Sequence, residues 1–222
     1  MTLRHLGIIA DGNRRWARER GLASIEGHKK GIEVIEPLVM AAKEAGIEYI
    51  TFYVFSTENW GRSAEEVGYI MKLAETKILK FSEKLAENNG KLLILGSKER
   101  ISPKLKGIFE EAEKKTEKCD GIRVCFCFNY GGEQEIAEAA KIAASEGEIT
   151  PETIRKHLYH PEVPDVDMVV RTSGEERVSG FMLWRIAYSE FMFIKKYFPE
   201  MKSEDIWEIV KEYEGRSRRF GK

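Results

Sequence analysis

Short apolar runs alternate with longer segments of helical period along this chain of 222 residues. The runs are rich in β-branched and aromatic residues and have few polar interruptions, which is typical of buried strands. They cover residues 6–10, 49–55, 91–95, 122–128, 166–170 and 191–194. Strands that alternate with helices predict βαβ units, and therefore an α/β fold with a mostly parallel six-stranded sheet flanked by helices on both faces.

The segments between the strands are amphipathic. In 29–45, the apolar side chains fall on one stripe, and Gly46 follows as the expected C-terminal glycine. Further helices are predicted at 64–88, 102–118, 133–145, from 151 onward and from 203 toward 214. Ser102, Thr150 and Ser203 stand at their starts as expected caps. Since no Pro- or Ser-rich linker and no repeat interrupts this pattern, we expect a single domain over residues 1–222.

Composition limits the partners and the compartment. The formal net charge is −1, so no bulk basic field indicates a nucleic-acid-binding protein. The three cysteines, Cys119, Cys125 and Cys127, form no CxxC pair and are expected as buried thiols in a reducing compartment. The first residues do not resemble a signal peptide, and no apolar run has the ~20 residues that span a membrane. We therefore expect a cytoplasmic protein that contains local, not global, positive charge.

The segment after the first predicted strand has the composition of an anion and metal site. In parallel sheets, ligands gather beyond the carboxyl ends of the strands. Asp11 can hold Mg²⁺, Gly12 lets a phosphate approach the backbone, and free N–H groups there can bind it. Arg14 and Arg15 add charge-assisted hydrogen bonds. The alternative is an Asp-Gly turn with solvated arginines, and neither a Walker loop nor a dinucleotide motif is present.

Polar residues also follow the strands at 49–55 and 166–170. After the first of these come Ser56, Thr57, Asn59 and Arg62, which can bind phosphate but can equally form a loop that caps the next helix. After the second come Arg171, Arg177 and Ser179, which suit a diphosphate gripped from several sides.

Three further observations accompany this set. Glu190 precedes the last apolar run and could complete a metal site with Asp11. His28 could bind phosphate or merely pack, and surface ion pairing of Arg177 with Glu175 or Glu176 is the alternative to its binding a ligand. Arginines after three strands of a nearly neutral chain predict one pocket for several phosphate groups, and no Cys-His, Ser-His-Asp or HExxH arrangement competes.

The motifs closely resemble those of the cis-prenyltransferases, the undecaprenyl diphosphate synthase family. They read HxxIIxDGNxRWA, GHxxG, FSTENWxR and RTSGExRxSxFxLWxxAYxE, in the family's order from His5 to Glu190, and the RRFG tail is also similar. The resemblance implies a hydrophobic tunnel and a homodimer. It also implies an enzyme that condenses an allylic prenyl diphosphate with isopentenyl diphosphate, with Mg²⁺ as cofactor. A greasy product would bring such an enzyme to a membrane surface.

The resemblance also implies roles for individual residues. Asp11 and Glu190 would bind the metal, and Asp11 and Asn59 would be catalytic, Asn59 at the position linked to proton removal from isopentenyl diphosphate. Substrate contacts would come from Gly12, Asn13, Arg14, Arg15, Trp16, Ser24, His28, Phe55, Ser56, Thr57, Glu58, Trp60, Arg62, Arg171, Arg177, Val178, Ser179, Arg219 and Gly221. Arg219 and Gly221 belong to a tail that reaches toward an active site across the dimer.

The chain also departs from the family's pattern. Ser24 stands where arginine is usual, so one diphosphate ligand is missing, and Arg185 is a candidate to replace it. Ala10, Ser63 and Gly180 stand where methionine, proline and asparagine are common. These changes leave open the acceptor, the product length and the regiochemistry, including coupling of two allylic diphosphates to a short product. Two hypotheses from different classes are a non-catalytic partner subunit and an unrelated phosphate-binding enzyme such as a phosphatase.

Overall fold

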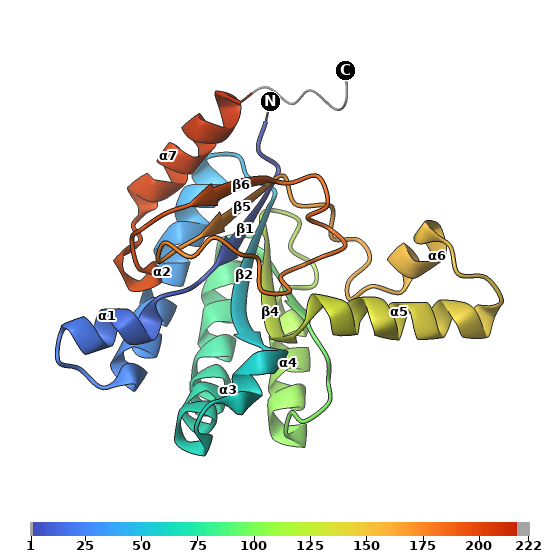
Figure 1. Cartoon of the computed structure of the whole chain (residues 1–222), viewed down its shortest axis with the longest axis horizontal. Coiled ribbons are helices and arrows are strands. Elements are labelled where there is room, and N and C mark those ends of the chain that lie inside the picture. The colour runs from blue at the N-terminus through green and yellow to red at the C-terminus, as the bar shows by residue number, and fades with distance from the viewer. Residues whose placement is uncertain (1, 217–222) are drawn as a thin grey trace.

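The computed structural model describes residues 2–216, which form one α/β domain (Figure 1). Its sheet has six strands in the order β3-β4-β2-β1-β5-β6, and every neighbouring pair is parallel. The strands are β1 (His5–Ile9), β2 (Tyr49–Ser56), β3 (Lys91–Leu95), β4 (Arg123–Tyr130), β5 (Met168–Arg171) and β6 (Glu190–Phe193). All six predicted strands are confirmed, and the sheet is wholly parallel where the sequence predicted a mostly parallel one.

The helices include the six that were predicted, in the predicted order, and one short helix after β1 that was given no range from the sequence. They are α1 (Asn13–Glu19), α2 (Ser24–Glu44), α3 (Ala64–Glu87), α4 (Pro103–Thr116), α5 (Gly132–Glu146), α6 (Pro151–Lys156) and α7 (Ser203–Glu214), with 3₁₀ turns η1 (Thr57–Gly61) and η2 (Phe198–Glu200). Ser102 and Thr150 cap their helices as predicted, and Gly46 is left-handed with φ 78°. Ser203 is instead the first helical residue, after Lys202 at the cap. Helix α2 begins at Ser24 and not at the predicted 29. The prediction missed the first turn because that turn faces a polar cavity and lacks the apolar stripe.

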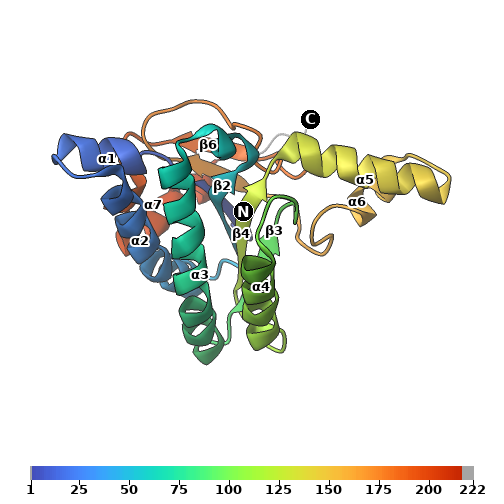
Figure 2. The same cartoon turned by 90° about the horizontal axis from the view of Figure 1, so that it is seen from below.

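The two faces of the sheet are covered differently. On one face, α2, α3, α4 and α7 contribute to a large apolar core through residues such as Leu38, Ile70, Leu105 and Ile206. Figure 2 shows these helices side by side, while α5 and α6 extend away from them. On the other face, the core includes side chains from irregular chain, among them Val163, Phe181, Met182 and Ile186. The expected helical cover on both faces is therefore correct for one face only.

Small residues on the second face explain how irregular chain can pack there. Cys125 and Cys127 are fully buried on that face, as predicted, whereas Cys119 is only partly buried. In β1, Gly7 lies beneath Phe181, and a Cβ at Gly7 would come within 2.7 Å of the Phe181 ring. Because the chain can approach so closely, the segment that follows β5 is held against the sheet. No helix within residues 2–216 is both long and apolar enough to cross a bilayer.

Candidate active site

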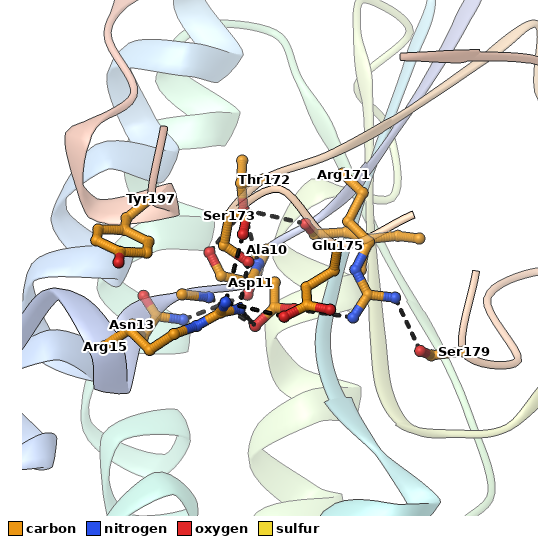
Figure 3. A network of polar contacts seen from close by, with 12 residues as sticks. Ala10, Asp11, Asn13, Arg15, Arg171, Thr172, Ser173, Glu175, Ser179 and Tyr197 are labelled. Atoms are coloured by element: carbon orange, nitrogen blue, oxygen red, sulfur yellow. Dashed lines mark hydrogen bonds and ion pairs between the residues drawn. The ribbon is translucent and has the colours of Figure 1, made fainter. Parts of the chain in front are cut away.

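An ion pair at the carboxyl edge of the sheet forms the centre of the site (Figure 3). Asp11 follows β1, and Arg171 ends the neighbouring strand β5, where it pairs in register with Ile9. The Arg171 Nη2 atom donates to Asp11 Oδ2 at 2.8 Å. Arg171 is buried, with 5% of its side chain exposed, whereas 29% of the Asp11 side chain is exposed. The carboxylate thus remains accessible while its partner is fixed.

The surroundings of Asp11 favour its ionised form. Burial raises the pKa of this carboxyl group, but the hydrogen bond and charge of Arg171 outweigh burial and hold the pKa below its usual range. The Gly12 amide donates to Oδ1 at 2.7 Å, and an Arg15 nitrogen lies 3.4 Å from the same oxygen. Asp11 is therefore an anion near neutral pH, as a metal ligand must be.

A second carboxylate holds the loop after β5 in place. Glu175 pairs with Arg15 at 2.9 Å and also with Arg177. Arg171 donates to the backbone oxygen of Arg177 and, at 2.8 Å, to Ser179 Oγ. The predicted residues of this loop are therefore gathered near Asp11. The guanidinium of Arg177 forms the predicted ion pair with Glu175, and 60% of its side chain is exposed.

A polar cavity of about 530 Å³ lies between β1, α1 and the start of α2. It contains most of the residues that were predicted from the segment after β1, together with Ser24, His28 and Arg62 from farther along the chain. The lining residues are Ala10, Asp11, Gly12, Asn13, Arg14, Arg15, Arg18, Leu22, Ala23, Ser24, His28 and Arg62. Its arginines outnumber its single aspartate, so the cavity is suited to a polyanionic ligand.

An apolar pocket of about 290 Å³ adjoins the polar cavity. It lies between α2, α3 and the sheet, and its walls include Phe52, Phe81, Phe126 and Phe128. Three residues, Ala10, Asn13 and His28, line both spaces. A ligand with a polyanionic head and an apolar tail can therefore lie across the junction.

The predicted residues of the 55–62 segment are mostly structural in this state. Phe55 is fully buried and stacks on Phe128 at 5.3 Å. The Trp60 indole donates to Asn129 Oδ1 at 2.7 Å. Ser56 and Asn59 form the cap of η1, in which the Ser56 amide donates to Asn59 Oδ1 at 3.2 Å. The segment therefore caps its own 3₁₀ turn and not the next helix, which Ser63 caps, and Arg62 is its member in the polar cavity.

Several predicted contacts lie outside the two cavities. Thr57 donates to Glu58 at 3.1 Å, Trp16 lies in α1 under the guanidinium of Arg20 at 4.7 Å, and Val178 packs partly against the second core. Thr57, Glu58, Trp16 and Val178 line neither cavity. Arg219 and Gly221 lie outside the described residues.

Glu190 does not complete a metal site with Asp11 within one chain, and that expectation is corrected. Glu190 begins β6 opposite Met168, whereas Asp11 follows the far end of β1, at least three strand residues, or about 10 Å, farther along the sheet. Its carboxylate instead accepts from Arg216 at 3.0 Å. A residue that precedes a parallel strand lies at the opposite edge from one that follows a strand.

Arg185 does not replace the arginine that is missing at Ser24. Its side chain is 1% exposed, pairs with the equally buried Glu135 at 2.8 Å and lines neither cavity. Two of the other departures have local reasons. Gly180 has φ 75°, a conformation that glycine and asparagine both tolerate, and Ser63 caps α3 by accepting from the Glu66 amide.

The donor set fits Mg²⁺ only as a complex with a phosphate ligand. Within residues 2–216, no group of three or more His, Cys, Asp or Glu side chains could hold a metal ion. Mg²⁺ is commonly bound through one or two carboxylates together with substrate phosphates, so Asp11 alone is sufficient when a diphosphate is present. The buried Arg171 Nε, which has no partner among the described residues, is a spare donor beside Asp11.

The fold and site define a class of α/β enzymes that bind a phosphorylated head group beside an apolar tail. The chain belongs to the family described as "Putative undecaprenyl diphosphate synthase", whose sequence profile matches residues 9–221. An isoprenyl transferase of Thermotoga maritima is 44% identical, and the match covers 98% of this chain and 96% of that protein. A decaprenyl diphosphate synthase of Mycobacterium leprae is 43% identical over 98% of this chain and 76% of its own length.

A solved structure has the same fold over the whole chain. Lavandulyl diphosphate synthase from Lavandula x intermedia, in complex with dimethylallyl diphosphate, aligns with a TM-score of 0.96 at 30% identity, over 100% of this chain and 99% of the other. The predicted family is therefore confirmed, and with it the class of prenyltransferases.

The sequence analysis missed Arg18, Leu22 and Ala23 in the wall of the polar cavity, and Glu66 behind it. Glu66 is the most informative of these. It begins α3 in the pattern Ser63-x-x-Glu66, which is typical of a helix cap and gives no sign of a ligand site. In the structure its carboxylate accepts from His28 Nε2 at 3.0 Å and from Arg62 at 2.9 Å, and it lies 3.8 Å from Arg14.

Proposed function

We propose that this protein condenses an allylic prenyl diphosphate with isopentenyl diphosphate to a cis-prenyl diphosphate and releases diphosphate. The observation that carries the proposal is the junction of an arginine-rich cavity with an aromatic-walled pocket. The charges match a diphosphate, and the apolar pocket matches a prenyl chain, each buried CH₂ of which contributes about 0.8 kcal/mol. The pocket is the entrance of the predicted hydrophobic tunnel.

The residues at the junction support the chemistry of each step. The C1–O bond of the allylic substrate breaks, and negative charge develops on the departing diphosphate, which the cavity arginines stabilise. The double bond of isopentenyl diphosphate attacks C1, and its C2 proton leaves as the new double bond forms. Asp11 and the diphosphate would hold Mg²⁺, which supplies further stabilisation of the leaving group when bound.

The second diphosphate is assigned to the loop after β5. Arg171, Arg177 and Ser179 form one connected group beside Asp11, so a single ligand can contact all three. Glu175 would then release Arg177 to the substrate. The role of Asn59 in proton removal stays a prediction, because its side chain caps η1 in this structure.

A homodimer is part of the proposal. The sheet ends at β6, an edge strand with Phe193 37% exposed, and Tyr188, just before it, is 81% exposed. Edge strands that carry exposed apolar side chains are suited to pairing with a second chain. We propose that Glu190 and the tail with Arg219 and Gly221 act across this dimer. We also propose that the enzyme is cytoplasmic and meets membranes through its product.

Product analysis tests the function. The purified protein is incubated with dimethylallyl, geranyl, farnesyl or geranylgeranyl diphosphate, each with and without isopentenyl diphosphate, and the products are identified by mass spectrometry. Products that grow by C5 units only when isopentenyl diphosphate is present are expected. The absence of any condensation with all four acceptors would refute the proposal.

Coupling of two allylic diphosphates is the second candidate. Two observations favour it. The chain fits lavandulyl diphosphate synthase over nearly all of both chains, and that structure holds the allylic dimethylallyl diphosphate. In addition, Ser24 leaves the polar cavity without one expected arginine. A C10 product from dimethylallyl diphosphate alone would establish this reaction. Long products that require isopentenyl diphosphate would exclude it as the main activity.

A further inference from the structure

A buried carboxylate joins the two walls of the polar cavity from behind. Glu66 is in the first turn of α3, and only 10% of its side chain is exposed. It binds His28 of α2 at 3.0 Å and Arg62, at the end of η1, at 2.9 Å. His28 and Arg62 line the cavity, whereas Glu66 does not. A ligand in the cavity can therefore contact His28 and Arg62 while both side chains stay hydrogen-bonded to Glu66 on the side away from the cavity.

The contact also determines which nitrogen of His28 carries the proton. An ionised carboxylate only accepts hydrogen bonds, so His28 Nε2 must donate to Glu66. This leaves Nδ1, which has no hydrogen-bond partner among residues 2–216, as the nitrogen available to a ligand. In the neutral ring, Nδ1 carries a lone pair instead of a proton, and this lone pair repels a phosphate oxygen. It becomes a donor only when the ring takes up a second proton.

Burial, helped by two nearby arginines, keeps the His28 ring neutral in the free protein. Burial lowers the pKa of His28, the hydrogen bond to Glu66 opposes burial, and the charges of Arg62 and Arg14 lower the pKa further. These groups come from α3, the end of η1 and α1, the elements whose charges act on the ring. A diphosphate in the cavity would add negative charge on the Nδ1 side and favour the imidazolium.

We propose that Glu66 is a positioning residue for diphosphate recognition: it orients Arg62 and His28 and stabilises the proton that His28 takes up on Nδ1 as the diphosphate binds. This rests on the proposed function, because it assigns the polar cavity to a diphosphate. A carboxylate behind an imidazole acts in the same way in other sites, where it holds the tautomer and stabilises the imidazolium.

The variant Glu66→Gln tests the role, with Glu65→Gln as the matched control. Glu65 is the exposed neighbour in the same helical turn, so the control makes the same charge change outside the cavity. Calorimetric titration with inorganic diphosphate, in buffers of different ionisation enthalpy at pH 8, measures proton uptake on binding. The ligand's own titration is common to all proteins and cancels in the differences. We expect Glu66→Gln to take up about one proton less per site than the other two proteins.

Kinetics give a second readout. The interaction is present before and after the C–O bond breaks, so its loss should act as a loss of uniform binding. We expect the KM for the allylic diphosphate to rise about tenfold in Glu66→Gln, with kcat changed less than about threefold. This is the effect of one pKa unit of lost stabilisation. Proton uptake and KM equal to those of the wild type would overturn the proposal.

A measurement on the wild type decides the matter if Glu66→Gln fails to fold. The chain has four histidines, so ¹⁵N NMR can assign His28 with the help of a His28→Gln variant. We expect the Nε2–H tautomer in the free protein and a doubly protonated ring with inorganic diphosphate. The opposite tautomer, or a ring that stays neutral in the complex, would refute the inference. A wild type that neither binds diphosphate nor turns over prenyl diphosphates would instead refute the proposed function.

Discussion

Two arginine–carboxylate pairs of equal length lie in different parts of this molecule. Asp11 with Arg171 and Glu135 with Arg185 are each separated by 2.8 Å. In the second pair, both side chains are 1% exposed, and Arg185 also donates to the backbone oxygens of Tyr159, His160 and Val163. In the first, Asp11 is 29% exposed, and Arg171 Nε has no partner among the described residues.

The difference shows what separates a binding pair from a structural pair. Glu135 is enclosed by its donors, because Tyr130, the Tyr159 amide and Arg185 all donate to it and only 1% of its side chain is exposed. The pair therefore joins β4, α5 and the irregular chain that covers the second face. Asp11 has an accessible oxygen, and Arg171 has a spare donor, so this pair can exchange partners when a ligand arrives. Unused hydrogen-bonding capacity, and not the length of the ion pair, indicates the site.

The largest effect is expected when the fully buried pair of Arg185 and Glu135 is broken. Arg185→Leu leaves Glu135 as a buried charge without its counter-ion, which should lower the free energy of unfolding by about 3–5 kcal/mol. Urea denaturation would measure the loss. The double variant Arg185→Leu with Glu135→Leu is the control, and it should recover much of the stability because no charge is left unpaired. A single variant as stable as the wild type would show that the pair is not structural.

Breaking the partly exposed pair of Asp11 and Arg171 should affect turnover instead. Asp11→Asn keeps the shape of the side chain but removes the charge, and we expect kcat to fall by about 10²–10³-fold, equivalent to about 2.7–4 kcal/mol. The free energy of unfolding should fall by less than in Arg185→Leu, because Asp11 is partly exposed and the buried Arg171 keeps its hydrogen bonds to Arg177 and Ser179. Steady-state kinetics and urea denaturation of the same samples separate the two effects. Unchanged kcat would remove Asp11 from the mechanism.

Acid should lower the free energy of unfolding through the buried His5. Burial lowers the pKa of His5 to about 4, backbone hydrogen bonding opposes this, and the charge of Arg185 lowers it further. The unfolded chain protonates near pH 6.5 while the folded ring stays neutral. Stability from this group is therefore complete above pH 6.5 and lost as pH falls toward 4, by about 3 kcal/mol. Denaturation curves between pH 7 and 4 should show this slope, and His5→Gln should lack it.

The smallest effect, on the free energy of unfolding, is expected at Gly12, next to Asp11. Gly12 has φ 98°, and an added Cβ would lie 2.5 Å from the Tyr197 ring and 2.9 Å from Ser173. Gly21 is the control, because it has φ 65° with nothing within 4 Å of the added atom. Both alanine variants should lose about 1–2 kcal/mol for the left-handed backbone. Thermal unfolding should show a further loss only for Gly12→Ala, and equal losses would mean that the contact yields freely.

The sequence predicts the fold well because the signal is local. Each strand is a continuous apolar run, and each helix has a clear stripe or cap, so all six strands follow from patterns within a few residues. The position of Asp11 and Arg171 also follows, since both stand at the ends of strands that a parallel sheet brings to one edge. The part of the polar cavity that follows β1 and β2 was predicted for this reason, whereas Asn13 and Ser24 came from the family resemblance.

What was missed depends on contacts between distant segments. Glu66 looks like a capping residue, and only the packing of α3 against α2 brings it to His28, at 38 residues' separation. Arg185 was interpreted as a ligand because nothing near it in sequence identifies Glu135 as its partner, 50 residues away. Glu190 was misplaced for another reason. Residues after parallel strands share one edge of the sheet, but Glu190 is the first residue of β6 and so lies at the opposite edge.

The most direct test of the account is whether Asp11 makes diphosphate binding depend on Mg²⁺. Calorimetric titration of inorganic diphosphate into the wild type and into Asp11→Asn, each with and without Mg²⁺, measures four affinities. Coordination by one carboxylate and the phosphates predicts that Mg²⁺ strengthens binding to the wild type at least about tenfold and adds little in the variant. An equal enhancement in both proteins, or none in the wild type, would contradict the assignment of this cavity.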